Sequence, residues 1–328
     1  MKASEAVANY GSNRAAARAL GVDPNTIRNR LAKEKATAAV KIPTIKNRNV
    51  PIATVIKRLA QGVANDDANA RDRKWFRVHV NDAKPIGLMW FGDPHLGTHT
   101  AWDTLSKHVA LCATTPGMYG ANIGDTTNNW VGRLTRLYAD EDISRQTERR
   151  LAKWFLAESG VTWLAWLMGN HDEWEHGAEI LRLMDIHNRV PMLDWEAKFE
   201  IVFKGKNKVR VHAAHDFPGN SMWNITHAPA RAPRMLGTDA DLYVCGHRHD
   251  WGIQQFEQTE RGKCPLAIRV RGYKKHDPYA RRHGYQQAEH GASILTIIDP
   301  AASTPGRVTA FVDIEQGVKV LKALRGGK

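Results

Sequence analysis

The chain has 328 residues, of which 42% are hydrophobic and 25% are charged, a composition that suits one large domain and a smaller segment. It contains no apolar run of about 18 residues or more, so we expect no membrane-spanning helix. The N-terminal segment is polar and lacks an apolar core, so we expect no secretory signal peptide. Three widely spaced cysteines, Cys112, Cys245 and Cys264, argue against a disulfide framework or a thiolate zinc site, and we expect a cytoplasmic location.

Positive charge is concentrated in the first quarter of the chain. The net charge is +13; residues 1–77 carry 16 Lys or Arg and 6 Asp or Glu, while the other 251 residues carry 31 and 28. A basic segment of this kind predicts a polyanionic partner, with nucleic acid the first candidate. The alternative is a solvated basic tail.

Three short helices are predicted at the N-terminus, over residues 3–10, 13–20 and 24–33. Ser12 and Asp23 are good N-cap residues, and Pro24 suits the first position of the third helix. Ile27 and Leu31 are four residues apart and are expected to face inward. The polar residues expected to face outward from the third helix are Asn25, Thr26, Arg28, Asn29 and Arg30.

Residues 1–35 resemble the helix-turn-helix domains of bacterial regulators and transposase-like proteins, above all over AAARALGVDPNTIRNRLAK. The resemblance implies that the third helix enters the major groove of DNA, with the outward polar residues as the contacts. The alternative is a helical arm that packs on the main domain or on a partner, and a homo-oligomer also remains open.

Residues 36–74 are expected to be a linker with a short helix near 53–59, and residues 75–328 a domain of the α/β or α+β class. Short apolar runs predict strands over 86–91, 119–123, 163–168, 199–203, 209–213, 241–245, 267–272, 293–298 and 307–313. Longer patterns predict helices over 101–112, 143–157, 178–189 and 221–227.

Polar clusters follow five of the predicted strands, where ligand sites of α/β folds usually lie. Their candidate ligands are Asp93, His95, Asp125, Asn170, His215, His247 and His249. Carboxylate, amide and imidazole ligands without thiolate suit divalent manganese, iron, zinc or magnesium. Seven ligands are more than one tetrahedral ion can bind, and they suit two ions that share a bridging carboxylate. His212 competes with His215, but it lies inside its strand, whereas His215 follows the strand end.

The ordered set D-x-H, G-D-x-x-N, G-N-H-D, H and G-H-x-H resembles the calcineurin-like metallophosphoesterase superfamily. The motifs cover residues 84–250. The resemblance implies a four-layer αββα sandwich over residues 75–328 and two divalent metal ions, manganese first, with iron, zinc or magnesium as alternatives.

The resemblance also implies a role for each motif residue. Asp93, His95 and His249 hold the first ion, Asp125 bridges the two, and Asn170, His215 and His247 hold the second. His171 donates a proton to the leaving oxygen, Asp172 orients its ring, and Asn128 supports the site or a bound phosphate. A hydroxide held between the ions then attacks phosphorus in line.

The substrate is open at this point. Protein phosphatases of the superfamily usually carry GDxxDRG, and GDTTNNW here counts against them. The basic N-terminal segment favours a DNA-directed phosphodiesterase or nuclease from a bacterial or phage genome-handling system. The alternatives are a small-molecule phosphodiesterase or phosphatase and a DNA-binding regulatory protein with a vestigial metal site.

A second basic stretch comes after the last motif and contains Arg269, Arg271, Lys274 and Lys275. It predicts a path for a phosphate backbone beside the metal centre. The equally weighted alternative is a charged, solvated sheet edge.

Overall fold

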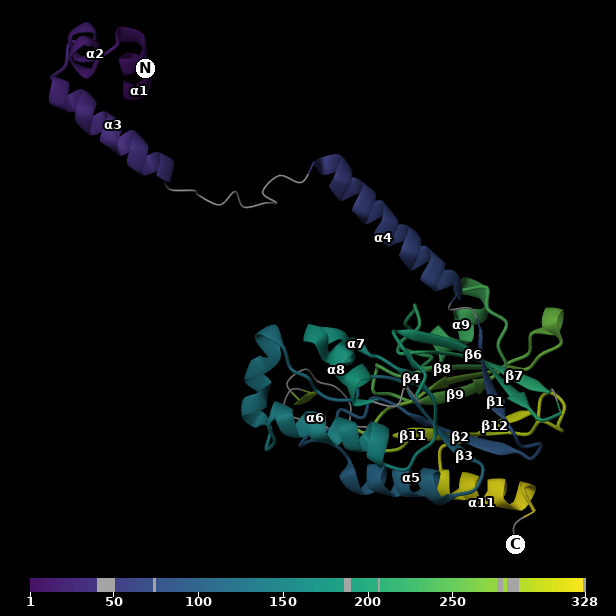
Figure 1. Ribbon diagram of the computed structural model, residues 1–328. Helices are drawn as coiled ribbons and strands as arrows, with labels where there is room; N and C mark the ends of the chain where they lie inside the picture. The colour runs from purple at the N-terminus through teal and green to yellow at the C-terminus, as the bar shows by residue number, and fades with distance from the viewer. Residues whose placement is uncertain are drawn as a thin grey trace. The chain divides into compact units, whose positions relative to one another are not determined.

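The computed structural model describes residues 1–39, 51–72, 75–185, 190–205, 207–275, 280–281 and 289–326 (Figure 1). Two compact units make up the chain, Met1–Ala68 and Asn69–Lys328, and each is considered by itself. Within the described ranges, no helix combines the length and the apolar character that a bilayer crossing requires.

The N-terminal unit contains the three expected helices, α1 (Ala3–Tyr10), α2 (Asn13–Ala19) and α3 (Pro24–Ala39). Ser12 caps α2 by accepting a hydrogen bond from the backbone N–H of Ala15 at 3.2 Å. The fully buried side chains at the centre are Ala6, Ala16 and Ile27, so small residues allow the helices to approach closely. Glu34 of α3 accepts hydrogen bonds from the backbone N–H groups at the start of α1. The buried centre and the hydrogen bonds of Glu34 therefore hold the three helices together.

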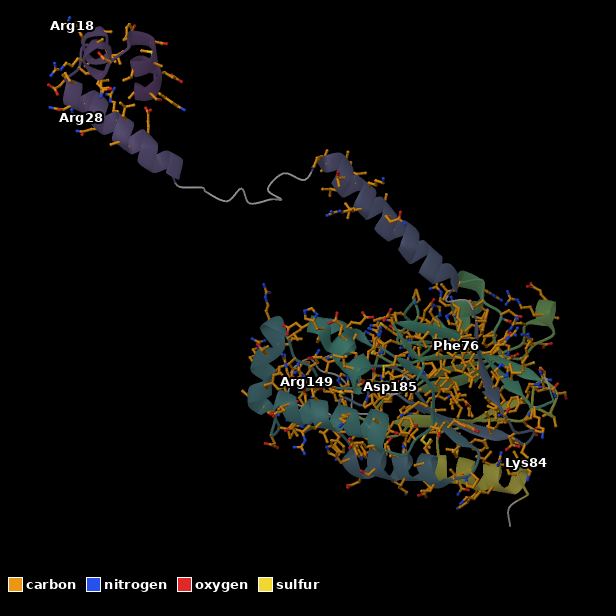
Figure 2. All side chains as sticks on the ribbon, in the orientation of Figure 1. Arg18, Arg28, Phe76, Lys84, Arg149 and Asp185 are labelled. Carbon is orange, nitrogen blue, oxygen red and sulfur yellow. The ribbon has the colours of Figure 1, made fainter. Side chains whose placement is uncertain are left out.

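The outer face of α3 carries the polar residues predicted to contact DNA. Asn25, Arg28, Asn29 and Arg30 are exposed and Thr26 is half-buried, while Ile27 between them is fully buried. Figure 2 labels Arg28 on this helix. The inward prediction is confirmed for Ile27, whereas Leu31 is only half-buried, and contact with DNA remains a prediction.

A long helix, α4 (Ile52–Asp72), occupies much of the segment expected to be a linker. It begins just after Pro51, whose carbonyl accepts a hydrogen bond from Thr54 at 2.8 Å. Proline is tolerated there because the first turn of a helix needs no N–H donor from it. The expected short helix near 53–59 is thus part of a longer one, and residues 40–50 lie outside the described residues.

Two six-stranded sheets form the C-terminal unit, which confirms the mixed α/β class. The first sheet has the order β12-β11-β2-β3-β4-β5. Its strands are β2 (Ile86–Phe91), β3 (Met118–Asn122), β4 (Trp163–Leu167), β5 (Met192–Leu193), β11 (Ser293–Ile298) and β12 (Val308–Phe311). Strands β2 to β5 run parallel, with Phe91 in register with Asn122.

The second sheet has the order β1-β6-β7-β8-β10-β9. Its strands are β1 (Phe76–Val80), β6 (Glu196–Phe203), β7 (Lys208–Ala214), β8 (Leu242–Cys245), β9 (Gly252–Gln255) and β10 (Leu266–Arg269). Strands β7, β8 and β10 run parallel. Each sheet therefore contains a set of neighbouring parallel strands, and the carboxyl ends of these strands lie at the same edge of the sheet.

The two sheets share one hydrophobic core. Trp90 and Leu167 of the first sheet lie in the same buried cluster as Phe199, Val211 and Val244 of the second. Strand β2 is buried along its whole length because its other face also packs, and its sequence IGLMWF is accordingly a continuous apolar run.

Several helices pack on the outer face of the first sheet, and α9 packs on that of the second (Figure 1). On the first sheet, α5 (Trp102–Thr114), α6 (Arg145–Lys153), α8 (Gly177–Met184) and α11 (Ile314–Leu324) contribute to a second buried cluster with Met89 and Leu295. On the second sheet, α9 (His227–Met235) packs Ala228 and Ala232 with Tyr243 and Cys245. The remaining short helical segments are η1 (Gly132–Asp140), η2 (Trp154–Glu158), α7 (Asn170–Glu173), η3 (Trp174–His176) and η4 (Thr259–Arg261).

Several helix predictions need correction. The helix expected over 221–227 is wrong, since the helix begins at His227 and runs to Met235 with Pro229 and Pro233 buried inside it. The helix expected over 143–157 is α6 followed by the π-helical turn η2. The helix expected over 178–189 ends at Met184, and residues 186–189 lie outside the described residues.

Candidate metal centre

Loops from both sheets meet at the carboxyl ends of their parallel strands. Asp93 and His95 follow β2, Asp125 follows β3, and Asn170 follows β4. His215 follows β7, while His247 and His249 follow β8. The two sheets are joined at this edge by His215, whose Nδ1 donates a hydrogen bond of 2.9 Å to the carbonyl of Ile123. Neighbouring parallel strands thus deliver all seven predicted ligands to one place.

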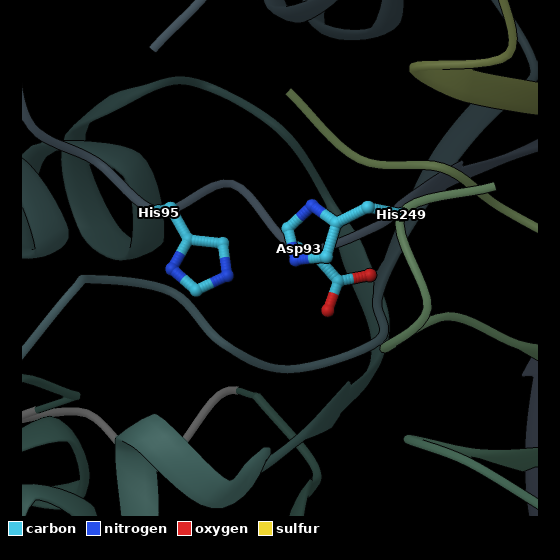
Figure 3. A group of neighbouring side chains, drawn as sticks. All are labelled: Asp93, His95 and His249. Carbon is cyan, nitrogen blue, oxygen red and sulfur yellow. The ribbon is translucent and has the colours of Figure 1, made fainter. Parts of the chain in front are cut away.

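The first ligand group consists of Asp93, His95 and His249. One ligand atom from each of these side chains lies within 4.8 Å of the others. Figure 3 shows them coming together from two chain segments, the loop after β2 and the loop after β8. The rings of His95 and His249 are stacked with their centroids 5.1 Å apart.

The second ligand group consists of Asp125, His215 and His247, and Asn170 joins it. His215 Nε2 lies 3.1 Å from Asn170 Oδ1, 3.0 Å from His247 Nδ1 and 3.4 Å from Asp125 Oδ2. Asp125 Oδ2 also lies 3.7 Å from His95 Nε2 of the first group. Asp125 is therefore the residue that both groups share.

His212, the competing candidate, lies elsewhere. Its ring nitrogens face Thr238 Oγ1 at 3.0 Å and Glu196 Oε2 at 3.3 Å. The structure brings His215, and not His212, into the ligand group.

The backbone is strained at most of the ligands. Five of them have a left-handed φ: Asp93 (35°), His95 (42°), Asp125 (51°), His247 (69°) and His249 (54°). This conformation is uncommon for residues other than glycine, and such strain is typically kept where it serves a site. Glycine at 169 and 246 permits the close approach, because a Cβ at either position would overlap the carboxylate of Asp125 or Asp93.

Buried polar atoms in the first group lack a partner. Asp93 Oδ1 and both ring nitrogens of His95 are buried with no hydrogen-bond partner among the described residues. Such atoms are costly to bury unless something else binds them. Their donor set of carboxylate oxygen and imidazole nitrogen fits a divalent cation.

Burial and mutual charge shift the pKa values of Asp93, Asp125 and His215. Burial raises the pKa of the Asp93 carboxyl to about 8, although the charge of His215 opposes the shift. Burial tends to lower the pKa of His215, but Asp125 and Asp93 outweigh it and raise that pKa to about 10. Burial tends to raise the pKa of Asp125, but His215 and the neighbouring histidines hold it well below its usual range. A protonated His215 thus supplies charge that a bound cation would replace.

His95 and His249 are available as neutral ligands. Burial, and next the charge of Lys274, hold the pKa of His95 well below its usual value and lower that of His249 to about 3. Neutral imidazole is the form that binds metals. The buried His and Asp groups are therefore able to hold a metal ion.

No family model matches this chain, and no curated protein shows significant similarity to it. The assignment of a function therefore depends on the chemistry of the site.

His171 lies beside the ligands but is held by Asn128. Its Nδ1 donates to the carbonyl of Asn128 at 2.5 Å, and its Nε2 lies 4.0 Å from Asp125 Oδ2. The Asp172 carboxylate instead accepts hydrogen bonds from the backbone N–H groups of Thr126 at 2.9 Å and Gly169 at 3.0 Å. The prediction that Asp172 orients the His171 ring is therefore wrong, and the carbonyl of Asn128 has that role.

The second basic stretch divides into buried and surface residues. Arg269 is 3% exposed and donates to Asp216 Oδ1 and to the carbonyls of Ile225 and Gly246. Arg271 is 8% exposed and donates to the carbonyls of His290 and Glu289. Both guanidinium groups are committed inside the fold, so the prediction that they contact a nucleic-acid backbone is wrong. Lys275 is exposed, and for it the prediction stands untested.

Lys274 belongs to the centre itself. Its Nζ donates to Asn128 Oδ1 at 3.2 Å and lies 4.4 Å from the centroid of the Trp130 ring. Glu141 accepts from the other end of the same amide, Asn128 Nδ2, at 2.8 Å. The sequence alone does not identify Glu141, and it assigns Lys274 only to a surface path for a phosphate backbone. Contacts between residues far apart in the sequence, such as Lys274 and Asn128, leave no local pattern.

Proposed function

We propose that this chain is a dinuclear-metal-dependent phosphoesterase of the calcineurin-like metallophosphoesterase superfamily that acts on the phosphodiester bonds of DNA. The observation that carries the proposal is the position of Asp125, whose Oδ2 faces His215 Nε2 at 3.4 Å and His95 Nε2 at 3.7 Å. A carboxylate between two ligand groups can bridge two cations. The order of layers, helices on either side of two packed sheets, supports the four-layer αββα sandwich expected for that superfamily.

In this proposal Asp93, His95 and His249 hold one divalent ion, and Asn170, His215 and His247 hold the other. The oxygen and nitrogen donors favour manganese, with iron, zinc and magnesium as alternatives. When bound, the two ions would supply Lewis acidity, which activates water as the nucleophile and neutralises charge on the phosphoryl oxygens.

The protein's own residues would manage orientation and protons. The Ile123 carbonyl holds the proton of His215 on Nδ1, so that Nε2 faces the ligand group. The Asn128 carbonyl does the same for His171 and leaves Nε2 toward the site. With Nδ1–H bound to that carbonyl, Nε2 carries a proton only in the imidazolium form of the ring. Burial lowers the pKa of His171, although Asp125 opposes the shift, so the imidazolium would pass its Nε2 proton readily to a departing oxygen.

The N-terminal unit supports DNA as the substrate. A helix with Asn25, Arg28, Asn29 and Arg30 exposed on one face would tether the catalytic unit to DNA and raise the local substrate concentration. A small-molecule phosphodiesterase is the second candidate, since hydrolysis at the centre does not itself require a long substrate.

A metal and substrate panel tests the proposal. Full-length protein is freed of metal with a chelator and reloaded with Mn²⁺, Mg²⁺, Zn²⁺ or, without oxygen, Fe²⁺. It is then assayed on plasmid DNA, oligonucleotides and bis(p-nitrophenyl) phosphate. We expect Mn²⁺-dependent cleavage of DNA and of the ester; cleavage of the ester alone would support the second candidate.

Asp125→Ala provides the matched control for the metal centre. This variant should lose bound metal together with activity. A wild-type protein that binds metal but cleaves none of these substrates would contradict the proposed function.

A further inference from the structure

The strongest feature that the proposed function leaves unused is the lysine beside the ligands. Lys274 is half-buried, and its ammonium group is held by two side chains that are almost fully buried, Asn128 and Trp130. The hydrogen bond to Asn128 Oδ1 is 3.2 Å, and the Trp130 ring centroid is 4.4 Å away. A cation over an aromatic face with a carbonyl-type acceptor is held at a defined position.

Asn128, which binds the Lys274 ammonium, is itself held in place. Glu141 accepts from Asn128 Nδ2 through Oε1 at 2.8 Å and from the backbone N–H of Thr98 through Oε2 at 2.9 Å. The chain on the N-terminal side of Lys274 is fixed as well, because the N–H of Tyr273 donates to the carbonyl of Asp93 at 3.2 Å. The main chain next to Lys274 is therefore bound to the loop that carries the first ligands.

Asn128 connects Lys274 to His171. The side chain of Asn128 accepts from Lys274, while its backbone carbonyl accepts from His171 Nδ1. One buried residue thus sets a fixed positive charge next to the ring proposed as the proton donor. With two divalent ions in place, Asp93 and Asp125 would leave the centre short of negative charge, and Lys274 adds one more positive charge.

We propose that Lys274 binds an unesterified oxygen of the substrate phosphate, on the side of the centre where His171 lies. This assignment rests on the proposed function for its substrate. An ammonium donates charge-assisted hydrogen bonds to phosphate oxygens, and its position beside His171 would orient the phosphate with the leaving group toward that ring.

The test compares Lys274→Gln with the wild-type protein, using inorganic phosphate as the probe. Calorimetric titration of phosphate into the Mn²⁺-loaded protein should show a ten- to hundredfold higher Kd for the variant, roughly the loss of one charge-assisted hydrogen bond. Lys274→Arg should restore part of the affinity. Lys322→Gln on α11 removes the same charge from an exposed position and should bind phosphate like the wild type.

Two further readouts separate a direct role from a structural one. Metal content should be unchanged in Lys274→Gln, and KM for bis(p-nitrophenyl) phosphate should rise by a larger factor than kcat falls. Loss of metal in this variant would overturn the inference, because Lys274 would then support the centre instead of the substrate. Unchanged phosphate affinity would also overturn it.

The inference and the proposed function fail in different ways. If the loaded wild-type protein binds phosphate with the help of Lys274 but cleaves no ester, the proposed function is wrong, and Lys274 belongs to a phosphate-binding site without hydrolytic activity. If cleavage is intact and Lys274→Gln binds phosphate like the wild type, only the inference is wrong.

Discussion

The ring of His171 donates a hydrogen bond from Nδ1 to the backbone carbonyl of Asn128 over 2.5 Å. Since a carbonyl only accepts, the proton of the neutral ring is on Nδ1, and Nε2 is left facing Asp125 Oδ2 at 4.0 Å. A main-chain acceptor fixes the ring without adding a further carboxylate to Asp93 and Asp125. The position of His171 therefore depends on the path of the loop after β3.

His171→Ala should leave the metal centre intact and slow catalysis. Because the proposed metal ligands are other side chains, metal content should match that of the wild type. Loss of the proton donor should lower kcat by about 10²–10⁴ for a diester with a poor leaving group. The loss should be far smaller for a p-nitrophenyl ester, whose leaving group needs little protonation. Equal losses on the two substrates would contradict the assigned role.

Asp172→Asn should affect stability more than proton transfer. The Asp172 carboxylate accepts from the N–H groups of Thr126 and Gly169, and an amide offers one acceptor where the site needs two. We expect a loss of about 1–3 kcal/mol in the free energy of unfolding and weaker metal binding. Denaturant unfolding and metal titration measure both. A variant of normal stability whose leaving-group dependence matches that of His171→Ala would restore the original assignment.

Gly169→Ala should prevent metal binding by displacing Asp125. A Cβ at position 169 would overlap Asp125 Oδ1 and lie 2.6 Å from the backbone nitrogen of Asp125. The loop cannot move away without shifting the residue that both ligand groups share. Gly205→Ala is the control, since no heavy atom lies within 4 Å of a Cβ there. Metal content after dialysis should fall in the first variant alone; a fully loaded Gly169→Ala protein would refute this account.

The strands and the ligand loops were largely predictable from the sequence. Apolar runs marked β2 and β11 at their observed bounds because both strands are buried on two faces, which leaves a continuous pattern. Strand β1 was missed, although Phe76, Val78 and Val80 alternate with polar residues, since it is a short strand at a sheet edge. Helix α9 was missed because its two prolines look like helix breakers.

The candidate ligands were predictable because each lies in a short local motif directly after a strand. The partners of His171, Asp172 and Lys274 were not, for two physical reasons. His171 and Asp172 bind backbone C=O and N–H groups, and no sequence motif identifies which backbone group a side chain will bind. The third contact joins Lys274 to Asn128, whose meeting depends on how separate loops pack.

Glu200→Gln should destabilise the protein in a pH-dependent way. Glu200 is buried, which tends to raise its pKa, but hydrogen bonds from Lys208, Arg210 and Arg77 outweigh burial and lower the pKa to about 2 from an ordinary 4.5. A carboxyl whose pKa is lower in the folded than in the unfolded protein stabilises the fold at pH values above its unfolded-state pKa. This stabilisation is lost as the pH falls toward the folded-state pKa. We expect a loss of about 1–3 kcal/mol at pH 7.

The pH dependence separates this effect from simple loss of packing. Urea unfolding at a series of pH values should measure the difference in the free energy of unfolding between the variant and the wild type. This difference should be constant above about pH 5 and should shrink from about pH 4.5 toward pH 2. Glu158→Gln is the control, because Glu158 is 55% exposed in its pair with Lys153 and exposed pairs contribute little. A Glu200→Gln difference that does not change with pH would exclude the electrostatic explanation.

Replacing Arg28 and Arg30 by glutamine should weaken DNA binding and leave ester cleavage unchanged. Both side chains are exposed on α3, in the unit Met1–Ala68, whereas the candidate metal centre lies in the unit Asn69–Lys328. If both contact phosphates, the slope of log affinity against log salt should become shallower by about 2. Lys319→Gln with Lys322→Gln on α11 removes the same charge from another exposed helix and should leave DNA affinity near that of the wild type. An unchanged slope in the arginine variant would return the N-terminal unit to a role in packing or partner binding.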